Sequence, residues 1–116
     1  NGGAPLIYGD GGQSRDFTFV GDAVQANLRA AEAPEAACGE AFNVAYGGRI
    51  TLLELLAEIA DILGTEVTPE HAPPRDGDIR HSQADIGKAE SLLGYRPANT
   101  VRQGLEQTVE WFRNLH

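Results

Sequence analysis

Cysteine and long apolar runs are scarce in this sequence, and each scarcity excludes a class of protein. Cys38 is the only cysteine among the 116 residues, so no intrachain disulfide can form and a reducing compartment is expected. No apolar run approaches the roughly 18 residues that a membrane-spanning helix needs, and no signal peptide is recognisable. We therefore expect a soluble, cytoplasmic protein without a membrane partner.

Positive charge is scarce as well. Asp and Glu number 17 against nine Lys and Arg, which gives a formal net charge of −8. Such a charge repels nucleic acids and anionic membranes, because affinity for phosphate backbones comes from basic patches. A phosphorylated ligand would need a local cationic site. Lys88 is the only lysine, so that site would be built from arginine, whose guanidinium suits bidentate contacts with phosphate.

Four helices are predicted from capping residues and apolar periodicity. The expected helices span residues 22–33, 51–64, 85–94 and 100–112. Thr51 and Thr100 are each followed three residues later by Glu or Gln, which is the capping-box pattern. Asp22, with Gln25 three residues on, predicts a third such cap. Leu and Ile recur at helical spacing within residues 52–63 and predict a stripe that faces the core.

Short extended runs alternate with these helices, so the predicted fold class is α/β. Residues 5–8 and 16–20 are predicted to form an antiparallel hairpin around the glycine-rich turn at 9–15. Residues 40–46 form a short apolar run between two helices, which is typical of a parallel strand. Prolines confine residues 66–80 to an edge strand or a loop.

The parallel strand expected at residues 40–46 needs parallel neighbours, and the chain offers few. The length predicts a single domain over residues 1–116. This domain is expected to contribute one strand to a sheet whose other strands it does not contain, so we expect the chain to be truncated.

The glycine-rich stretch GDGGQS at residues 9–14 invites comparison with phosphate-binding loops. It does not fit the dinucleotide fingerprint, no helix follows it directly, and the lysine of a nucleotide-binding loop is absent. We therefore interpret it as a turn. Arg15 comes directly after this turn, either as a solvated surface side chain or as an anion ligand held on a rigid strand.

A second candidate segment, PPRDGDIRH, covers residues 73–81. Two prolines restrict the backbone before Arg75, and Gly77 permits a turn that returns Asp78 to its side. The segment is either a polar loop or a ligand clamp. The Asp76 and Asp78 pair does not have EF-hand spacing, and the histidines have no metal-like spacing, so no metal site is expected.

Three stretches together resemble a known family. They are YGDGGQSRDFTFVGDAVQAN (residues 8–27), FNVAYGG (42–48) and PPRDGDIRHSQADIGKAESLLGYRP (73–97). In order and spacing they resemble the C-terminal portion of the nucleotide-sugar epimerases and dehydratases, of the extended short-chain dehydrogenase/reductase family, most closely the UDP-glucose 4-epimerase type. The resemblance implies the substrate-binding part of a Rossmann-type fold without its N-terminal dinucleotide-binding half.

The resemblance also implies roles for individual residues. Arg15 and Arg75 match arginines that bind the diphosphate of the sugar nucleotide, and Asp78 matches an acid at the nucleoside end. Phe17 matches an aromatic position near the nucleotide. Residues Tyr46 to Gly48 match the loop after the last parallel strand, which borders the nucleotide.

Two features of the family are missing from the sequence. The family binds NAD with a glycine-rich strand-to-helix turn and transfers protons with a Tyr-x-x-x-Lys motif, whereas Ala84 stands four positions before Lys88. We therefore expect no catalytic residue in this chain. NAD is expected to bind the full-length family enzyme but not this fragment, which would be inactive alone.

The expected function is to hold the nucleotide diphosphate of a UDP-sugar while a missing N-terminal NAD-binding domain does the chemistry. The alternatives are a stand-alone, non-catalytic nucleotide-sugar-binding or assembly module, and the same part of a dehydratase or decarboxylase. An exposed strand edge also makes a homodimer possible.

Overall fold

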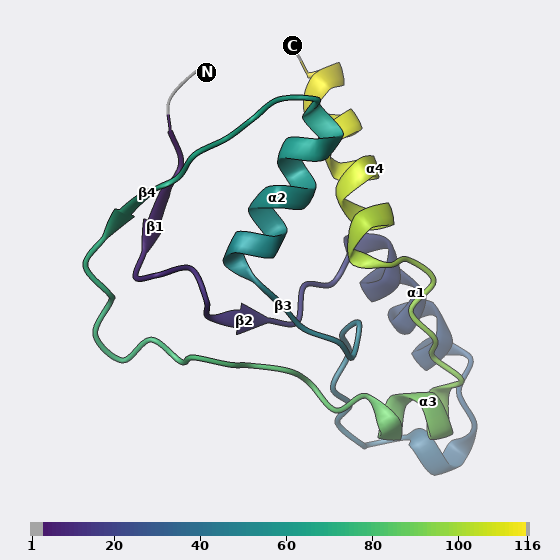
Figure 1. The fold of residues 1–116 in the computed structure, drawn as a ribbon. Coiled ribbons are helices and arrows are strands. Elements are labelled where there is room, and N and C mark those ends of the chain that lie inside the picture. The colour runs from purple at the N-terminus through teal and green to yellow at the C-terminus, as the bar shows by residue number, and fades with distance from the viewer. Residues whose placement is uncertain (1–3, 116) are drawn as a thin grey trace.

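The computed structural model describes residues 4–115. Its elements, in chain order, are β1 (Leu6–Tyr8), β2 (Ser14–Arg15), α1 (Val20–Ala31), the 3-10 helix η1 (Glu35–Ala37), β3 (Ile50–Thr51), α2 (Leu52–Leu63), β4 (Glu70–Ala72), α3 (Gly87–Leu93) and α4 (Val101–Asn114). The α/β class and the four predicted helices are confirmed (Figure 1). Within the described part of the chain, no helix is long and apolar enough to cross a membrane.

Two helices begin where the sequence predicts capping boxes. At the start of α2, Thr51 Oγ1 accepts a hydrogen bond from the Glu54 amide (3.1 Å), and Glu54 Oε1 accepts one from the Thr51 amide (2.9 Å). Thr100 and Gln103 form the same pair at the start of α4. Gly64 ends α2 in the left-handed conformation with φ of 69°. These boundaries are therefore determined by local hydrogen bonds.

The predicted N-cap at Asp22 is wrong. α1 begins two residues earlier, and Phe19 takes the N-cap position. The Asp22 side chain is 1% exposed, and its Oδ1 accepts hydrogen bonds from the Ala98 amide (2.9 Å) and from Asn99 Nδ2 (3.1 Å). The carboxylate thus binds the segment before α4 instead of the backbone of its own helix.

The predicted antiparallel hairpin is also wrong. β1 pairs in parallel with β4, and β2 pairs antiparallel with β3, so the two strands belong to different sheets (Figure 1). The turn between them is bound to α2, because the carbonyls of Gly11 and Gln13 accept hydrogen bonds from the amides of Leu53 and Leu52. β2 ends at Arg15, one residue before the predicted strand at 16–20 begins.

Residues 40–46 do not form the predicted parallel strand, and no described segment pairs with them. A strand needs a hydrogen-bonded neighbour, which the described residues do not supply. The side chains of this run still pack inward: Phe42 and Val44 lie against the core. That core consists of buried residues Ala26, Ala37, Ala45, Ile86, Ala89, Leu93 and Tyr95.

The proline-flanked segment was predicted to be an edge strand or a loop, and it contains both. β4 lies between Pro69 and Pro73 and pairs on one side only, with β1. From β4 the chain runs without regular structure to α3, and Ser14 forms an isolated parallel bridge with His81 on the way (Figure 1). This long segment carries Arg75 and Asp78 past β2.

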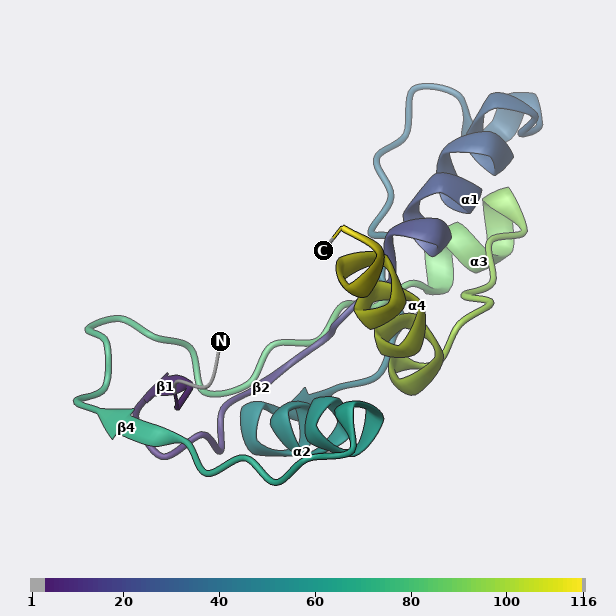
Figure 2. The ribbon, with the colours of Figure 1, turned by 90° about the horizontal axis from the view of Figure 1, so that it is seen from above.

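The molecule is flat and open. Seen from above, β1, β4 and α2 lie at one end and α1 and α3 at the other (Figure 2). The radius of gyration is 16.8 Å, whereas a compact domain of this length has about 13 Å. The accessible surface of 7842 Å² exceeds the roughly 6,100 Å² of a compact monomer of this mass.

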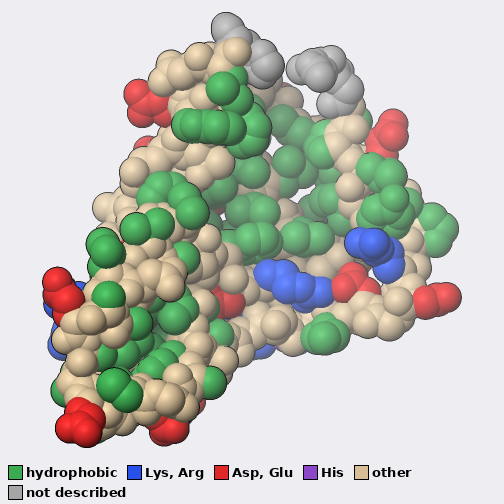
Figure 3. Space-filling view, turned by 180° about the vertical axis from the view of Figure 1, so that it is seen from behind, with side chains coloured by type: hydrophobic (Ala, Val, Ile, Leu, Met, Phe, Trp, Pro, Cys, Tyr) green, Lys and Arg blue, Asp and Glu red, His purple; other side chains and the backbone are tan. Residues whose placement is uncertain are grey.

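The apolar stripe of α2 faces α4 but is only partly covered, since α2 has no fully buried residue. Seen from behind, hydrophobic side chains line a hollow and basic side chains lie along its edge (Figure 3). The predicted core-facing stripe of α2 is therefore only partly covered.

Candidate functional site

Arg15, Arg75 and Asp78 meet at one cavity of about 220 Å³. β2 carries Arg15, and the segment between β4 and α3 carries the other two. The remaining lining comes from β1, its following turn and the start of α2: Leu6, Ile7, Tyr8, Gln13 and Leu52. The fold thus brings together the two arginines that the sequence singles out.

The guanidinium of Arg15 is held by the chain itself. Its Nη1 donates to the Ser14 carbonyl oxygen at 2.7 Å, and its Nη2 forms an ion pair with Asp78 Oδ1 at 2.7 Å. The two side chains are 28% and 30% exposed. Arg15 is therefore a fixed, partly shielded cation with an internal counter-ion.

Arg75 has a different environment. Its guanidinium carbon lies 5.3 Å from the centroid of the Tyr8 ring, which is a cation–π distance. Among the described residues no carboxylate forms an ion pair with Arg75. The ring positions the guanidinium and leaves its charge available to a ligand.

Gln13 connects the two sides of this cavity and was not found by sequence reasoning. The residue is 6% exposed, and its Nε2 donates to the Tyr8 carbonyl oxygen (3.0 Å) and, at a longer 3.4 Å, to Asp78 Oδ2. In the sequence it is only a polar residue of a turn. Its burial depends on a segment far away in the chain, so no local signal identifies it.

A third arginine, Arg80, borders the site. An adjoining cavity of about 310 Å³ shares Tyr8, Gln13, Arg75 and Asp78 with the first and adds Arg80. Arg80 Nη1 lies 2.7 Å from Asp10 Oδ1. The hydrogen bond from Arg80, followed by that from the Gly12 amide, holds the pKa of Asp10 below its usual value, and Asp10 raises the pKa of Arg80. This exposed pair joins the turn after β1 to the segment that carries Arg75 and Asp78.

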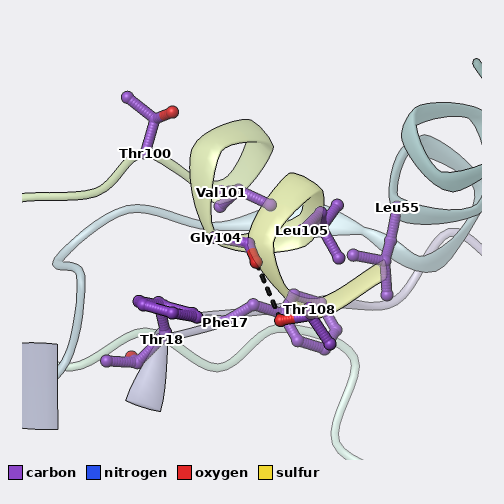
Figure 4. Close-up of a pocket in the computed structure, with 9 residues that line it drawn as sticks. Phe17, Thr18, Leu55, Thr100, Val101, Gly104, Leu105 and Thr108 are labelled. Carbon is purple, nitrogen blue, oxygen red and sulfur yellow. Dashed lines mark hydrogen bonds between the residues drawn. The ribbon is translucent and has the colours of Figure 1, made fainter. Parts of the chain in front are cut away.

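Phe17 lies outside the arginine cavity. It lines a separate, mainly apolar cavity of about 180 Å³ between the segment after β2 and helix α4 (Figure 4). On the α4 side Thr108 Oγ1 donates to the Gly104 carbonyl oxygen at 2.8 Å (Figure 4). The structure therefore separates Phe17 from the two arginines.

Tyr46 and Gly48 also lie outside the lining of the arginine cavity. Their loop is tied to the end of β2 through Asp16, whose carboxylate accepts hydrogen bonds from the amides of Tyr46 (3.1 Å), Gly47 (3.0 Å) and Ala84 (3.3 Å). Asp16 thus links the residue next to Arg15 with this loop and with the segment before α3. Within residues 4–115, no group of three His, Cys, Asp or Glu side chains is placed to hold a metal ion.

Comparison with known proteins shows which family this chain resembles. The model of the NAD dependent epimerase/dehydratase family matches residues 1–45. The UDP-glucose 4-epimerase of Mycolicibacterium smegmatis is 42% identical over 108 residues, which are 93% of this chain and 34% of that protein.

Solved structures agree with the sequence matches. The UDP-glucose 4-epimerase of Thermotoga maritima with UDP-glucose has a TM-score of 0.89 and 38% identity, covering 97% of this chain and 35% of that one. The UDP-glucuronic acid 4-epimerase of Bacillus cereus with UDP-glucuronic acid and NAD has a TM-score of 0.88 and 30% identity, with 97% and 36% covered. The chain spans about a third of the length of these relatives. It belongs to the NAD-dependent epimerase/dehydratase family and corresponds to the C-terminal part of its members.

Proposed function

We propose that residues 1–116 are a single substrate-binding domain of an NAD-dependent nucleotide-sugar 4-epimerase, of the type that acts on UDP-glucose or UDP-N-acetylglucosamine. Its task is to hold the nucleotide diphosphate. The observation that carries the proposal is the convergence of Arg15 and Arg75 on one cavity. The relatives whose structures contain UDP-glucose or UDP-glucuronic acid support this class of ligand.

Electrostatics favours a diphosphate at this cavity. The chain carries a formal net charge of −8, so an anionic ligand is repelled by the protein as a whole and needs local guanidinium groups. Two guanidinium forks bind two phosphate groups with charge-assisted, bidentate hydrogen bonds. The Phe17, Tyr46, Gly48 and Asp78 contacts with the nucleotide follow from the family resemblance and are part of the proposal.

The described residues do not fit NAD. Binding of the dinucleotide pyrophosphate needs a glycine-rich turn that leads into a helix N-terminus, whereas the turn after β1 leads into strand β2. Lys88 is already engaged: its Nζ donates to the Ala41 carbonyl oxygen (3.0 Å) and lies 3.3 Å from Glu40 Oε1. We propose that NAD binding and proton transfer belong to residues outside this chain and that the chain alone binds no NAD and has no activity.

The exposed apolar surface supports the proposal that another domain packs against this one. The apolar side chains of Val20, Val24 and Leu28 follow one another at helical spacing along α1 and are exposed. A stand-alone module would leave this stripe and the half-covered α2 in water, which is unfavourable. We therefore favour the NAD-binding half of the same enzyme as the partner. A cytoplasmic location and a homodimer stay predictions.

Titration calorimetry with UDP and with uridine tests the proposal. We expect Arg15→Ala and Arg75→Ala each to weaken UDP binding by about 1.5–3 kcal/mol, the usual scale for hydrogen bonds to charged groups. Arg29→Ala is the matched control, because Arg29 lies in the last turn of α1 and lines neither arginine cavity. Uridine lacks the diphosphate, so the wild type and the variants should bind it with the same affinity. The proposal is contradicted if the wild type and the three variants bind UDP with equal affinity.

A further inference from the structure

The two histidines that the structure describes lie at opposite ends of the segment that carries Arg75 and Asp78. Each is hydrogen-bonded through Nδ1 to the stretch of chain that leads from β1 to Arg15. We infer that His71 and His81 are positioning residues, which hold this segment at a fixed distance from Arg15. Neither histidine lines the two arginine cavities, so both act through the arginines. The inference rests on the proposed function, since it concerns the same cavities.

The first anchor lies at the end of β4. There the Gly9 amide donates to the Ala72 carbonyl oxygen at 2.9 Å, and the His71 ring adds a side-chain bond, with Nδ1 2.7 Å from the Gly9 carbonyl oxygen. A carbonyl oxygen accepts hydrogen bonds and donates none, so Nδ1 carries the hydrogen in this contact. Arg75 follows three residues after Ala72. His71 therefore fixes the point at which the segment leaves the sheet.

The second anchor lies at Ser14, directly before Arg15. The Ser14 amide donates to the Arg80 carbonyl oxygen at 2.8 Å, and the Ser14 carbonyl oxygen accepts from the Ser82 amide at 3.1 Å. Beside these two bonds Ser14 Oγ lies 2.6 Å from His81 Nδ1. A serine hydroxyl can donate or accept, so this contact forms with either tautomer of the imidazole. The Ser14 carbonyl oxygen also accepts from Arg15 Nη1 (2.7 Å), so the anchor and the guanidinium share one carbonyl group.

Between the two anchors the chains separate. No backbone hydrogen bond joins residues 10–13 to residues 73–80 in the part of the chain that the structure describes. The cavity of about 310 Å³ is lined by both stretches, so a ligand there lies between two stretches that are joined at their ends. The separation of Arg75 from Arg15 depends on those ends. The backbone bonds of both anchors remain when an imidazole is removed, so this loss should loosen the segment without unfolding it.

Titration calorimetry of UDP with the 116-residue chain tests the inference. We expect His71→Ala and His81→Ala each to weaken UDP binding about two- to fivefold, the lower part of the range for a neutral hydrogen bond, because both residues are exposed. His71→Asn and His81→Asn should restore the affinity, since the asparagine amide offers a donor and an acceptor in place of Nδ1. Ser82→Ala is the matched control, because Ser82 lies next to His81 and contributes to the anchor through its amide.

Further variants distinguish positioning from general stability. His71→Phe and His81→Phe keep a ring without its nitrogens and should bind UDP as weakly as the alanine variants. Ser14→Ala removes the partner of His81, so the double variant Ser14→Ala/His81→Ala should lose no more affinity than either single variant. Far-ultraviolet circular dichroism checks that each variant keeps its helices.

The outcomes separate the inference from the proposed function. The inference is supported if the alanine variants of both histidines lose affinity, the asparagine variants recover it and Ser82→Ala binds UDP like the wild type. If Arg15→Ala and Arg75→Ala weaken UDP binding but the histidine variants do not, or if asparagine fails to restore the affinity, the inference is overturned and the proposed function stands. An effect at one histidine alone overturns the inference for the other. If the arginine variants bind UDP as tightly as the wild type, or if the wild type binds no UDP, both are overturned.

Discussion

Replacement of Asp22 by alanine tests how strongly one buried carboxylate joins α1 to the segment before α4. Asp22 Oδ1 accepts two hydrogen bonds, from the Ala98 amide and from Asn99 Nδ2. Hydrogen bonds to a charged group contribute about 1.5–3 kcal/mol each. The alanine variant loses both, but it also removes Oδ2, which is buried without a partner among the described atoms. We therefore expect a net loss of about 2–3 kcal/mol in the free energy of unfolding.

Thermal and urea unfolding, followed by far-ultraviolet circular dichroism, measure this loss. Asp22→Asn should cost less than the alanine variant, since it keeps an acceptor oxygen and removes the buried charge. Asp85→Ala is the control, because Asp85 Oδ1 accepts a single, exposed hydrogen bond, from the Gly87 amide at 2.9 Å. This variant should lose at most about 1 kcal/mol, the scale of a local cap. The reasoning is refuted if Asp22→Ala is no less stable than Asp85→Ala.

Three further expectations follow from the packing. Gly104→Ala should lower the melting temperature although alanine favours helices by about 1 kcal/mol, because the added Cβ would lie 2.9 Å from Phe19 Cβ; an unchanged or higher melting temperature contradicts this. Arg102→Ala removes ion pairs from α4 to α2 that are partly exposed, so the midpoint of urea unfolding should fall slightly at low salt and the difference should disappear at high salt; a difference that persists at high salt argues against it. Burial, followed by two nearby carboxylates, raises the pKa of Tyr95, whose hydroxyl donates to the Ala45 carbonyl oxygen at 2.8 Å. Its contribution to stability is thus complete below a pH of about 10 and is lost as the pH rises through the raised pKa; Tyr95→Phe should lack this loss in alkaline unfolding, and identical profiles contradict the assignment.

The helices could be predicted because their signals are local. The capping boxes at Thr51 and Thr100 close within three residues, so their hydrogen bonds need no contact from the rest of the chain. Asp22 has the same sequence pattern but not the same structure. Its acceptor oxygens are used by Ala98 and Asn99, and such non-local competition leaves no mark in the neighbouring sequence.

The strands were predicted less well because pairing is not local. The hairpin signal between β1 and β2 is outweighed by β4 and by the start of α2, which take the hydrogen-bonding groups of β1 and of the turn. Residues 40–46 have the composition of a parallel strand but no described neighbour to pair with. Composition indicates that a segment can be a strand, and only the neighbouring backbone makes it one.

The sequence by itself determined the helices, the turn glycines and the dependence of any phosphate site on arginine, because these follow from local backbone preferences and from the charge balance. It also singled out Arg15, Arg75 and Asp78 as separate candidates. Only the tertiary structure decided that these residues share one cavity, that Asp78 neutralises Arg15, and that Gln13 joins them. The physical reason is that a long segment after β4 returns alongside β2, and contacts of this kind depend on the path of the whole chain.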